Sequence, residues 1–422
     1  MPLRFHALAE QGRGRKDDPL KMNQKDKVKE VLTRGVERIY PSPQALERKL
    51  RSGQKIRLYC GYDPSVPTLH IGHAITLRKL AQFQALGHEV IFLIGDFTGM
   101  IGDPTDRIMA RKKLTRQEVL KNAKNYQKLA SKILSFSGKN PVKILYNSQW
   151  NDKLSFVDLI ELASNFTVQQ MITRDMFQKR IGKKKPIYLH EFLYPLTQAY
   201  DSLAMDVDLE VGGNDQTFNM LCGRELMRAV KGKEKLVLTT KLLVDPTGQK
   251  MGKTTGQIIA LDEKPDQMYG KIMSWPDEII VLGLELCTDV AMKEINQIDS
   301  QMRKDKLNPR DAKAKLAKEI VTIHHNKKVA LQAEKEFNRI FREKEKPSKL
   351  PAFKLVAKKY KILDLLVQTK LVSSKSEAKR LVTQGGVKID NRVVKDWQKE
   401  IAIKDGLIIQ VGKRKFVQVV CQ

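Results

Sequence analysis

Two short segments of the chain combine residue types that can bind phosphate. The first is His70-Ile71-Gly72-His73, whose imidazoles are three positions apart and therefore share one face of a helix. A helix N-terminus with two imidazole donors suits phosphate oxygens, whereas a metal site needs further ligands that the neighbouring sequence does not offer, so we expect no metal. The second segment, Lys250-Met251-Gly252-Lys253-Thr254, is basic and contains a glycine. The first segment therefore predicts a phosphate site, and the second is a basic loop.

The second segment does not form a P-loop. The P-loop pattern has four residues between its glycines, and only three separate Gly248 from Gly252. A strand must also precede that loop, whereas Asp245-Pro246-Thr247-Gly248 is typical of a turn. The P-loop interpretation therefore fails on both counts.

The elements around the first segment predict a parallel α/β sheet. Apolar runs predict short strands at 56–61, 90–95 and 142–147. Helical spacing predicts helices at 69–86, 116–136 and 192–203. The apolar spacing over 25–50, which includes Val36, is also helical and is broken by Pro41 and Pro43. Alternating strands and helices form parallel sheets, and ligands bind at the carboxyl ends of their strands.

The rest of the chain is first helical and then strongly basic. Helices are predicted at 290–302 and 310–325, and the charged, proline-bounded stretch 339–351 predicts a linker. Residues 352–422 hold 16 Lys and Arg against 6 Asp and Glu, with short helices at 363–369 and 375–384 and strands at 387–389, 407–411 and 416–420. We therefore predict an arm (1–24), an α/β domain (25–262), a helical domain (263–338), a linker (339–351) and a small basic domain (352–422).

The composition favours a polyanionic partner such as nucleic acid. The 422 residues include 77 Lys and Arg against 48 Asp and Glu, a net charge of +29. Four scattered cysteines predict neither a disulfide framework nor a zinc site and fit the reducing cytoplasm. No apolar run approaches the ~20 residues that cross a bilayer, so we expect no membrane partner. Residues 1–21 are expected to be a flexible basic arm, with a natural start at Met22 or an organellar leader as alternatives.

Taken together, the two phosphate-binding segments resemble the HIGH and KMSKS signatures of class I aminoacyl-tRNA synthetases. Within that class the chain resembles the tyrosyl-tRNA synthetases, through residues 59–64 (YCGYDP), 98–104 (TGMIGDP), 194–201 (YPLTQAYD) and 212–216 (GGNDQ). The resemblance implies a Rossmann-like parallel-sheet catalytic domain, an α-helical domain and a small α+β S4-like RNA-binding domain.

The resemblance also implies the reaction. L-Tyrosine would be activated by ATP with Mg²⁺ to tyrosyl-adenylate, and the tyrosyl group would pass to the 3′-terminal adenosine of tRNA(Tyr). No tightly bound cofactor is implied, and the enzyme would be a cytoplasmic homodimer. No enzyme nucleophile is needed, because positioned donors stabilise the charge that develops on the α-phosphate.

Roles for single residues follow from the same resemblance. Tyr59 and Asp201 would bind the phenol hydroxyl of tyrosine. The ammonium group, carboxylate and ring of tyrosine would be bound by Asp103, Tyr194, Gln198, Gln216 and Thr98. ATP or the adenylate would contact Cys60, Gly61, Asp63, Ser65, Gly72, Thr76, Gly213, Asp215 and Met251. The phosphates would be bound by His70, His73, Arg107, Arg111, Lys250, Lys253 and Thr254.

The C-terminal unit resembles an S4 RNA-binding module over residues 371–381 and 385–390. Lys375, Lys379 and Arg380 fall on one short helix and would contact tRNA phosphates. Two other functions stay open. A tryptophan-specific synthetase would share the fold, although Tyr59 with Asp201 and the appended basic unit argue against it. A non-catalytic RNA-binding protein would not need both signature segments intact.

Overall fold

The computed structural model describes residues 24–103, 113–248, 250–251, 258–342, 351–412 and 415–421. The chain divides into two compact units, Met1–Lys327 and Lys328–Gln422. Four candidate site residues, Arg107, Arg111, Lys253 and Thr254, lie outside the described residues, as does the predicted arm up to residue 23. Within the described part of the chain, no helix is both long enough and apolar enough to cross a membrane.

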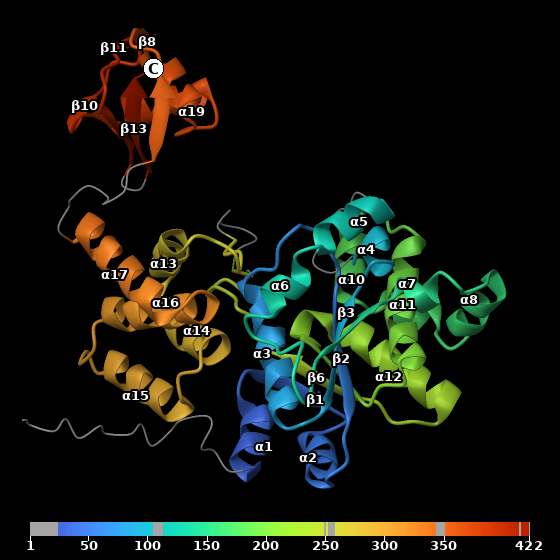
Figure 1. The fold of residues 1–422 in the computed structure, drawn as a ribbon. Helices are drawn as coiled ribbons and strands as arrows, with labels where there is room; N and C mark the ends of the chain where they lie inside the picture. The colour runs from blue at the N-terminus through green and yellow to red at the C-terminus, as the bar shows by residue number, and fades with distance from the viewer. Residues whose placement is uncertain are drawn as a thin grey trace, which may run out of the picture. The chain divides into compact units, whose positions relative to one another are not determined.

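The first unit is built on a six-stranded sheet with the strand order β1-β6-β5-β2-β3-β4 (Figure 1). The strands are β1 (Val36–Tyr40), β2 (Arg57–Tyr62), β3 (Glu89–Ile94), β4 (Lys143–Tyr146), β5 (Leu209–Gly213) and β6 (Leu236–Thr240). Strands β2 to β6 pair in parallel and β1 pairs antiparallel with β6. The chain runs from β2 towards β3 on one side, while β5 flanks β2 on the other. The strand order therefore reverses between β2 and β5, where open parallel sheets bind ligands.

Helices cover the sheet on both faces. Helix α3 lies on one face, and α11 and α12 lie on the other (Figure 1). The helices around the sheet are α1 (Gln24–Thr33), α2 (Pro43–Arg51), α3 (Ile71–Ala85), α4 (Thr98–Ile101), α5 (Arg116–Ala123), α6 (Tyr126–Ala130), α7 (Ser148–Asn151), α8 (Phe156–Ala163), α9 (Val168–Ile172), α10 (Asp175–Gly182), α11 (His190–Ala204) and α12 (Thr217–Lys231). The helical block that follows contains α13 (Pro265–Met273), α14 (Ile280–Cys287), α15 (Met292–Arg303) and α16 (Pro309–His324), and α17 (Lys327–Phe341) comes next.

The centre of the sheet shows why it can be predicted. In β3 the run Val90–Ile94 is continuously apolar, and every one of its side chains is at most 2% exposed. Such a run needs cover on both faces, which the helices supply. Helix α3 ends before Gly87, whose φ of +87° suits the glycine that commonly follows a helix.

Two sequence predictions about these elements are wrong, and one strand was missed. Val36 does not continue a helix but begins β1, because Gly35 with a φ of +63° ends the helical conformation after α1. The single helix predicted over 116–136 is two short helices, α5 and α6, with Asn125 at the break. Strand β5 was not predicted, because its five residues include Glu210 and two glycines.

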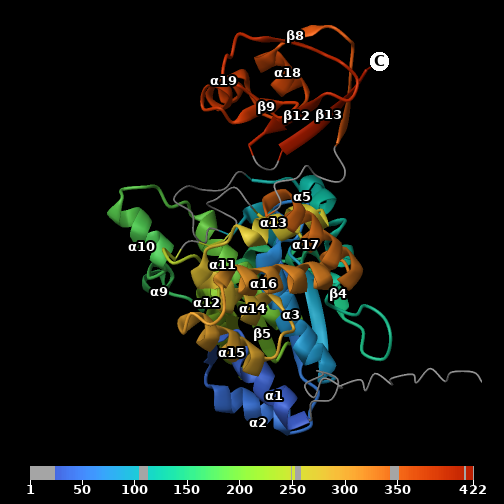
Figure 2. The same cartoon turned by 90° about the vertical axis from the view of Figure 1, so that its left-hand side faces the viewer.

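The second unit is a small α+β domain (orange and red in Figure 2). Its five-stranded sheet has the order β10-β9-β12-β13-β7, and β8 pairs with β11. Apart from α17, which falls almost wholly in this unit, its elements are β7 (Ala352–Leu355), β8 (Lys359–Lys361), α18 (Ile362–Gln368), α19 (Lys375–Thr383), β9 (Val387–Ile389), β10 (Arg392–Val394), β11 (Glu400–Ala402), β12 (Ile408–Val411) and β13 (Lys415–Cys421). Leu365 of α18, Val382 of α19 and Ile409 of β12 belong to one buried core. Both predicted helices and all three predicted strands are present, whereas the short strands β7, β8, β10 and β11 were not predicted.

Candidate active site

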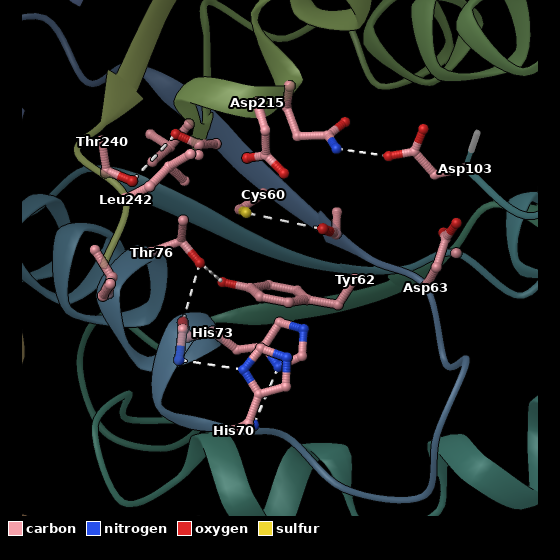
Figure 3. Close-up of a pocket in the computed structure, with 18 of the residues that line it drawn as sticks. Cys60, Tyr62, Asp63, His70, His73, Thr76, Asp103, Asp215, Thr240 and Leu242 are labelled. Atoms are coloured by element: carbon pink, nitrogen blue, oxygen red, sulfur yellow. Dashed lines mark hydrogen bonds between the residues drawn. The ribbon is translucent and has the colours of Figure 1, made fainter. Parts of the chain in front are cut away.

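A cavity of about 340 Å³ opens at the carboxyl ends of β2 and β5, within the size range of small-molecule sites (Figure 3). Every predicted catalytic, tyrosine-binding or ATP-binding residue that the structure describes lines this cavity. They are Tyr59, Cys60, Gly61, Asp63, Ser65, His70, Gly72, His73, Thr76, Thr98, Asp103, Tyr194, Gln198, Asp201, Gly213, Asp215, Gln216, Lys250 and Met251. The fold therefore gathers residues from positions 59 to 251 around one space.

The two signature histidines cap helix α3. His70 is the N-cap residue and its Nδ1 accepts from the backbone N–H of Gly72 at 3.2 Å, while the Nδ1 of His73 accepts from the backbone N–H of His70 at 3.1 Å. A neutral imidazole that accepts at Nδ1 carries its proton on Nε2. The rings stack with their centroids 3.8 Å apart (Figure 3). A Cβ on Gly72 would lie only 3.0 Å from the His70 ring, so glycine makes room for this stacking.

The segment that follows the second signature is hydrogen-bonded to the first. The backbone N–H of Ile71 donates to the carbonyl of Ile259 at 2.9 Å, and that of Leu261 donates to the carbonyl of Leu69 at 2.8 Å. Lys250 comes to the same cavity, where its ammonium group contacts the Asp215 carboxylate at 2.6 Å. The structure therefore brings the HIGH segment and the described part of the KMGKT segment together.

Asp201 is a buried carboxyl group on α11. It is 2% exposed and accepts hydrogen bonds from Trp150 Nε1 at 2.7 Å, Asn151 Nδ2 at 3.0 Å and Asn147 Nδ2 at 3.2 Å. Burial raises the pKa of Asp201 to about 8, although its three hydrogen-bond donors act in the opposite direction. The protein thus holds a carboxyl group in one orientation at the cavity wall.

Tyr59 reaches the same part of the cavity from β2. Its hydroxyl forms a 2.9 Å hydrogen bond with the hydroxyl of Ser202, the residue after Asp201. Burial raises the pKa of Tyr59 well above its usual value, and the nearby carboxylates of Glu210 and Asp201 raise it further. The phenol is therefore neutral and keeps a proton that it can donate.

A second group of polar side chains surrounds Asp63. Its carboxylate accepts from Thr98 Oγ1 at 2.7 Å and from the Tyr194 hydroxyl at 2.8 Å. A Cβ on Gly95 would stand 2.0 Å from Asp63 Oδ1 and 2.4 Å from Thr98 Oγ1. Only glycine can occupy this position while the carboxylate stays in place.

Asp103 and Gln198 complete the polar wall. Asp103 accepts from Gln216 Nε2 at 2.6 Å and from Arg174 at 3.3 Å, and Gln198 donates from Nε2 to Glu210 at 2.9 Å. The cavity wall therefore carries several carboxylates, which favour a cationic group such as an amino-acid ammonium.

Thr76 and Cys60 also line the cavity. The Thr76 hydroxyl bonds the Tyr62 hydroxyl at 2.9 Å and donates to the carbonyl of His73 at 3.0 Å (Figure 3). Burial raises the pKa of the Cys60 thiol to about 12, so this side chain is a neutral packing group rather than a nucleophile.

Several residues of the site were not predicted from the sequence. Asn147 and Glu210 line the cavity, while Trp150, Asn151 and Arg174 bind the predicted carboxylates from behind. Asn147 directly follows β4, so its position at a strand end could have indicated it. Glu210 is a charged residue among Leu209, Val211 and two glycines, and a charge in such a short strand could also have indicated a site residue.

The predicted RNA-binding residues lie on helix α19 of the second unit. Lys375, Lys379 and Arg380 are all exposed. The Lys375 ammonium contacts Asp364 at 2.6 Å, and that of Lys379 lies 4.1 Å from the centre of the Trp397 ring. An exposed aromatic ring beside cations is suited to nucleic acid as well as to structural packing.

Comparisons with known proteins identify the family. The model of the family "tRNA synthetases class I (W and Y)" matches residues 51–342, and that of the tyrosine–tRNA ligase C-terminal domain matches residues 343–419. The chain belongs to the tyrosine–tRNA ligase family of class I aminoacyl-tRNA synthetases. A tyrosine–tRNA ligase of Thermotoga maritima is 43% identical over 94% of this chain and 98% of that protein. One from Haemophilus influenzae is 44% identical over 92% of this chain and 95% of its own length.

Solved structures agree with this assignment. A truncated mitochondrial tyrosyl-tRNA synthetase of Coccidioides posadasii aligns with a TM-score of 0.59 at 25% identity, covering 74% of this chain and 94% of that one. The Archaeoglobus fulgidus enzyme, solved with L-tyrosine, shows the same fold with a TM-score of 0.59 at 23% identity, over 74% of this chain and 99% of that one. The predicted family, enzyme class and fold class are confirmed.

Proposed function

We propose that the phenol end of the cavity recognises the hydroxyl group of L-tyrosine. The observation that carries this proposal is the buried Asp201 carboxyl group beside the neutral Tyr59 phenol. An unpaired buried polar group costs free energy, and a hydroxylated ligand satisfies both groups at once. L-Phenylalanine would leave them unpaired. The same selectivity is a known example for tyrosyl-tRNA synthetases.

The ammonium and carboxylate of tyrosine would occupy the polar wall. Asp103, Tyr194 and Gln198 would bind the ammonium group, Thr98 would lie beside the ring and Gln216 near the carboxylate. Asp63 supports this end because it accepts hydrogen bonds from both Thr98 and Tyr194. The amino-acid carboxylate would then face the nucleotide end of the cavity.

ATP would enter as its Mg²⁺ complex with its phosphates beside the histidines. The Nε2–H groups of His70 and His73 can donate to phosphate oxygens, and Lys250 adds positive charge. Arg107, Arg111, Lys253 and Thr254 are proposed to act on the same phosphates. Asp215, Cys60 and Thr76 would contact the ribose side, with Gly61, Gly72, Gly213, Ser65 and Met251 as close contacts.

The reaction then needs no covalent enzyme intermediate. The tyrosine carboxylate oxygen attacks the α-phosphorus, a new P–O bond forms and pyrophosphate leaves. Donors placed around the α-phosphate stabilise the charge that this step develops. In the second step the terminal ribose hydroxyl of tRNA attacks the activated carbonyl and AMP leaves.

The second unit is proposed to bind tRNA(Tyr). Residues 352–422 carry 16 Lys and Arg against 6 Asp and Glu, a net of +10, and Lys375, Lys379 and Arg380 are exposed on α19. Such residues bind backbone phosphates without reading sequence. We place the activity in the cytoplasm, where ATP and uncharged tRNA are available.

A homodimer is the proposed assembly. Seven of the sixteen exposed large hydrophobic side chains among the described residues lie between positions 156 and 189. They include Phe156 at 76%, Val168 at 72% and Leu189 at 80% exposure. A concentration of exposed apolar groups of this kind marks an interaction surface, and the family resemblance favours a second copy of the chain as the partner.

Amino-acid-dependent exchange of pyrophosphate into ATP tests the proposal. With each of the twenty amino acids in turn, L-tyrosine should support exchange far better than L-phenylalanine or L-tryptophan. Exchange that depends on tryptophan would replace the tyrosine proposal, because both specificities share this fold. Binding of tRNA without exchange by any amino acid would favour a non-catalytic RNA-binding function.

A further inference from the structure

A buried pair of charged residues lies at the amino-acid end of the cavity, where Glu210 is part of the wall and Lys235 is not. Lys235, just before β6, is 0% exposed, and Glu210 of β5 is 2% exposed. The Lys235 ammonium group contacts Glu210 Oε2 directly. Removing two charged groups from water carries a large cost in desolvation free energy. Replacing such a pair by apolar residues often stabilises a protein. Their presence therefore calls for a reason other than stability.

Each member of the pair is connected by hydrogen bonds to a side chain that lines the cavity. Lys235 Nζ donates to Ser202 Oγ at 2.9 Å, and Ser202 Oγ bonds the Tyr59 hydroxyl at 2.9 Å. Glu210 Oε1 accepts from Gln198 Nε2 at 2.9 Å. Ser202 and Lys235 do not line the cavity, whereas Tyr59 and Gln198 do. The pair is thus linked to both proposed ends of the tyrosine site.

The chemistry of the two charges sets the direction of these hydrogen bonds. An ammonium group only donates, so Ser202 accepts from Lys235 and can turn its own proton towards the Tyr59 oxygen. Tyr59 then keeps its own proton to donate, either to the Glu210 carboxylate beside it or to a ligand oxygen in the cavity. A carboxylate only accepts, so the NH₂ group of Gln198 faces Glu210. The amide oxygen of Gln198 then points away from Glu210.

These directions match what tyrosine requires. A phenol oxygen can accept from Tyr59 while its proton goes to Asp201, and an ammonium group needs the amide oxygen of Gln198 rather than its NH₂ group. Burial lowers the pKa of the Lys235 ammonium group, and the Glu210 carboxylate in contact with it opposes that shift. Helix α12 leaves room for the arrangement, since a Cβ on Gly223 would lie 2.5 Å from Lys235 Nζ and 2.9 Å from Ser202 Oγ.

We propose that Lys235 and Glu210 are positioning residues that orient the Tyr59 proton, through Ser202, and the Gln198 amide for tyrosine recognition. The inference rests on the proposed roles of Tyr59 and Gln198. It adds three residues, none of them predicted from the sequence, to the machinery that selects the amino acid.

The hydrogen-bond relay from Lys235 through Ser202 to Tyr59 can be tested without removing the two charges. Ser202→Ala keeps Lys235 next to Glu210 but disconnects it from Tyr59. We measure kcat and KM for L-tyrosine and L-phenylalanine by pyrophosphate exchange. The ratio of the two kcat/KM values should fall about three- to tenfold, the range of one oriented hydrogen bond, mainly through the KM for tyrosine and with the KM for ATP unchanged. Thr197→Val is the matched control, because this buried hydroxyl on the same helix donates only to the carbonyl of Tyr194, at 2.8 Å, and its loss should leave the ratio unchanged.

A double-mutant cycle separates the relay from general destabilisation. In a Tyr59→Phe background, Ser202→Ala should cause no further loss of selectivity, because the relay has lost its end point. If the double variant instead loses selectivity by the product of the two single losses, the proposal is wrong, although Tyr59 would still belong to the tyrosine site. If Tyr59→Phe itself left selectivity unchanged, the proposed site and the inference built on it would both be wrong.

The charge pair is tested by a neutral replacement. Lys235→Gln with Glu210→Gln keeps hydrogen-bonding groups of similar size but removes the charges that impose direction. Thermal unfolding monitors the fold, and the KM for tyrosine should rise about three- to tenfold with loss of selectivity. A folded double variant with wild-type KM and selectivity would refute the proposal. If this variant does not fold, the Ser202→Ala cycle decides.

Discussion

Tyrosine binding should strengthen as the pH rises from 6 to 8, because a buried carboxyl group has to be ionised to accept the phenol proton. Burial raises the pKa of Asp201 to about 8 in the unliganded protein. Below that pH most Asp201 side chains carry a proton, and the ionised fraction falls about tenfold for each pH unit. Two groups beside Asp201 do not change charge in this range: the Tyr59 phenol stays neutral because its pKa is raised, and the Trp150 indole is a fixed donor.

The expected size follows from that titration. One pH unit corresponds to about 1.4 kcal/mol of binding free energy, so the dissociation constant for tyrosine should rise by roughly tenfold from pH 7 to pH 6. The three donors to Asp201 favour its ionised form, so a smaller slope in the same direction remains consistent with the structure.

Equilibrium dialysis with labelled L-tyrosine and no ATP measures this effect apart from the histidines at the phosphate end. Asp201→Asn cannot ionise and should bind tyrosine weakly at every pH. A wild-type dissociation constant that does not change between pH 6 and 8, or a pH dependence that persists in Asp201→Asn, would refute the reasoning.

Three further outcomes follow from the structure. Gly95→Ala places a methyl group 2.0 Å from Asp63 Oδ1, so tyrosine-dependent exchange should drop at least about tenfold in a protein that still unfolds cooperatively, and near-normal exchange would contradict the packing. Lys379→Ala with Arg380→Ala should raise the KM for tRNA several-fold and lower its salt dependence while leaving pyrophosphate exchange unchanged; an equal loss of exchange would argue against a separate RNA-binding role. Leu189→Asp, at a side chain that is 80% exposed, should shift the protein towards monomers in sedimentation, and an unchanged assembly state would move the interface elsewhere.

The sheet and the candidate residues could be predicted because their signals are local. Val90–Ile94 is continuously apolar over the length of a strand, and the HIGH and KMGKT segments carry recognisable spacing. Strand β1 could not be predicted in the same way. In the sequence Val36 continues the helical spacing of Val28 and Leu32, and only the positive φ of Gly35 separates it from α1. The partner strand β6 lies some 200 residues further along the chain, at positions such as Val36 with Thr240.

The parts of the site that escaped prediction depend on pairing between distant residues. Lys235 is an ordinary surface-type residue in the sequence, and only the fold shows that it is buried against Glu210 and linked to Ser202. The role of Asn147 and Trp150 likewise depends on their hydrogen bonds to Asp201, of 3.2 Å and 2.7 Å, and Asp201 lies some fifty positions later in the chain. Sequence patterns identify the groups that touch a substrate more readily than the groups that orient them.

A crystal structure of the full chain with L-tyrosine bound tests the central claim most directly. We predict that the phenol oxygen lies within hydrogen-bonding distance, about 2.5–3.0 Å, of both the Asp201 carboxylate and the Tyr59 hydroxyl, with the ammonium group among Asp103, Tyr194 and Gln198. Tyrosine bound with its ring in another part of the cavity, or with its hydroxyl facing solvent, would contradict the assignment of this site.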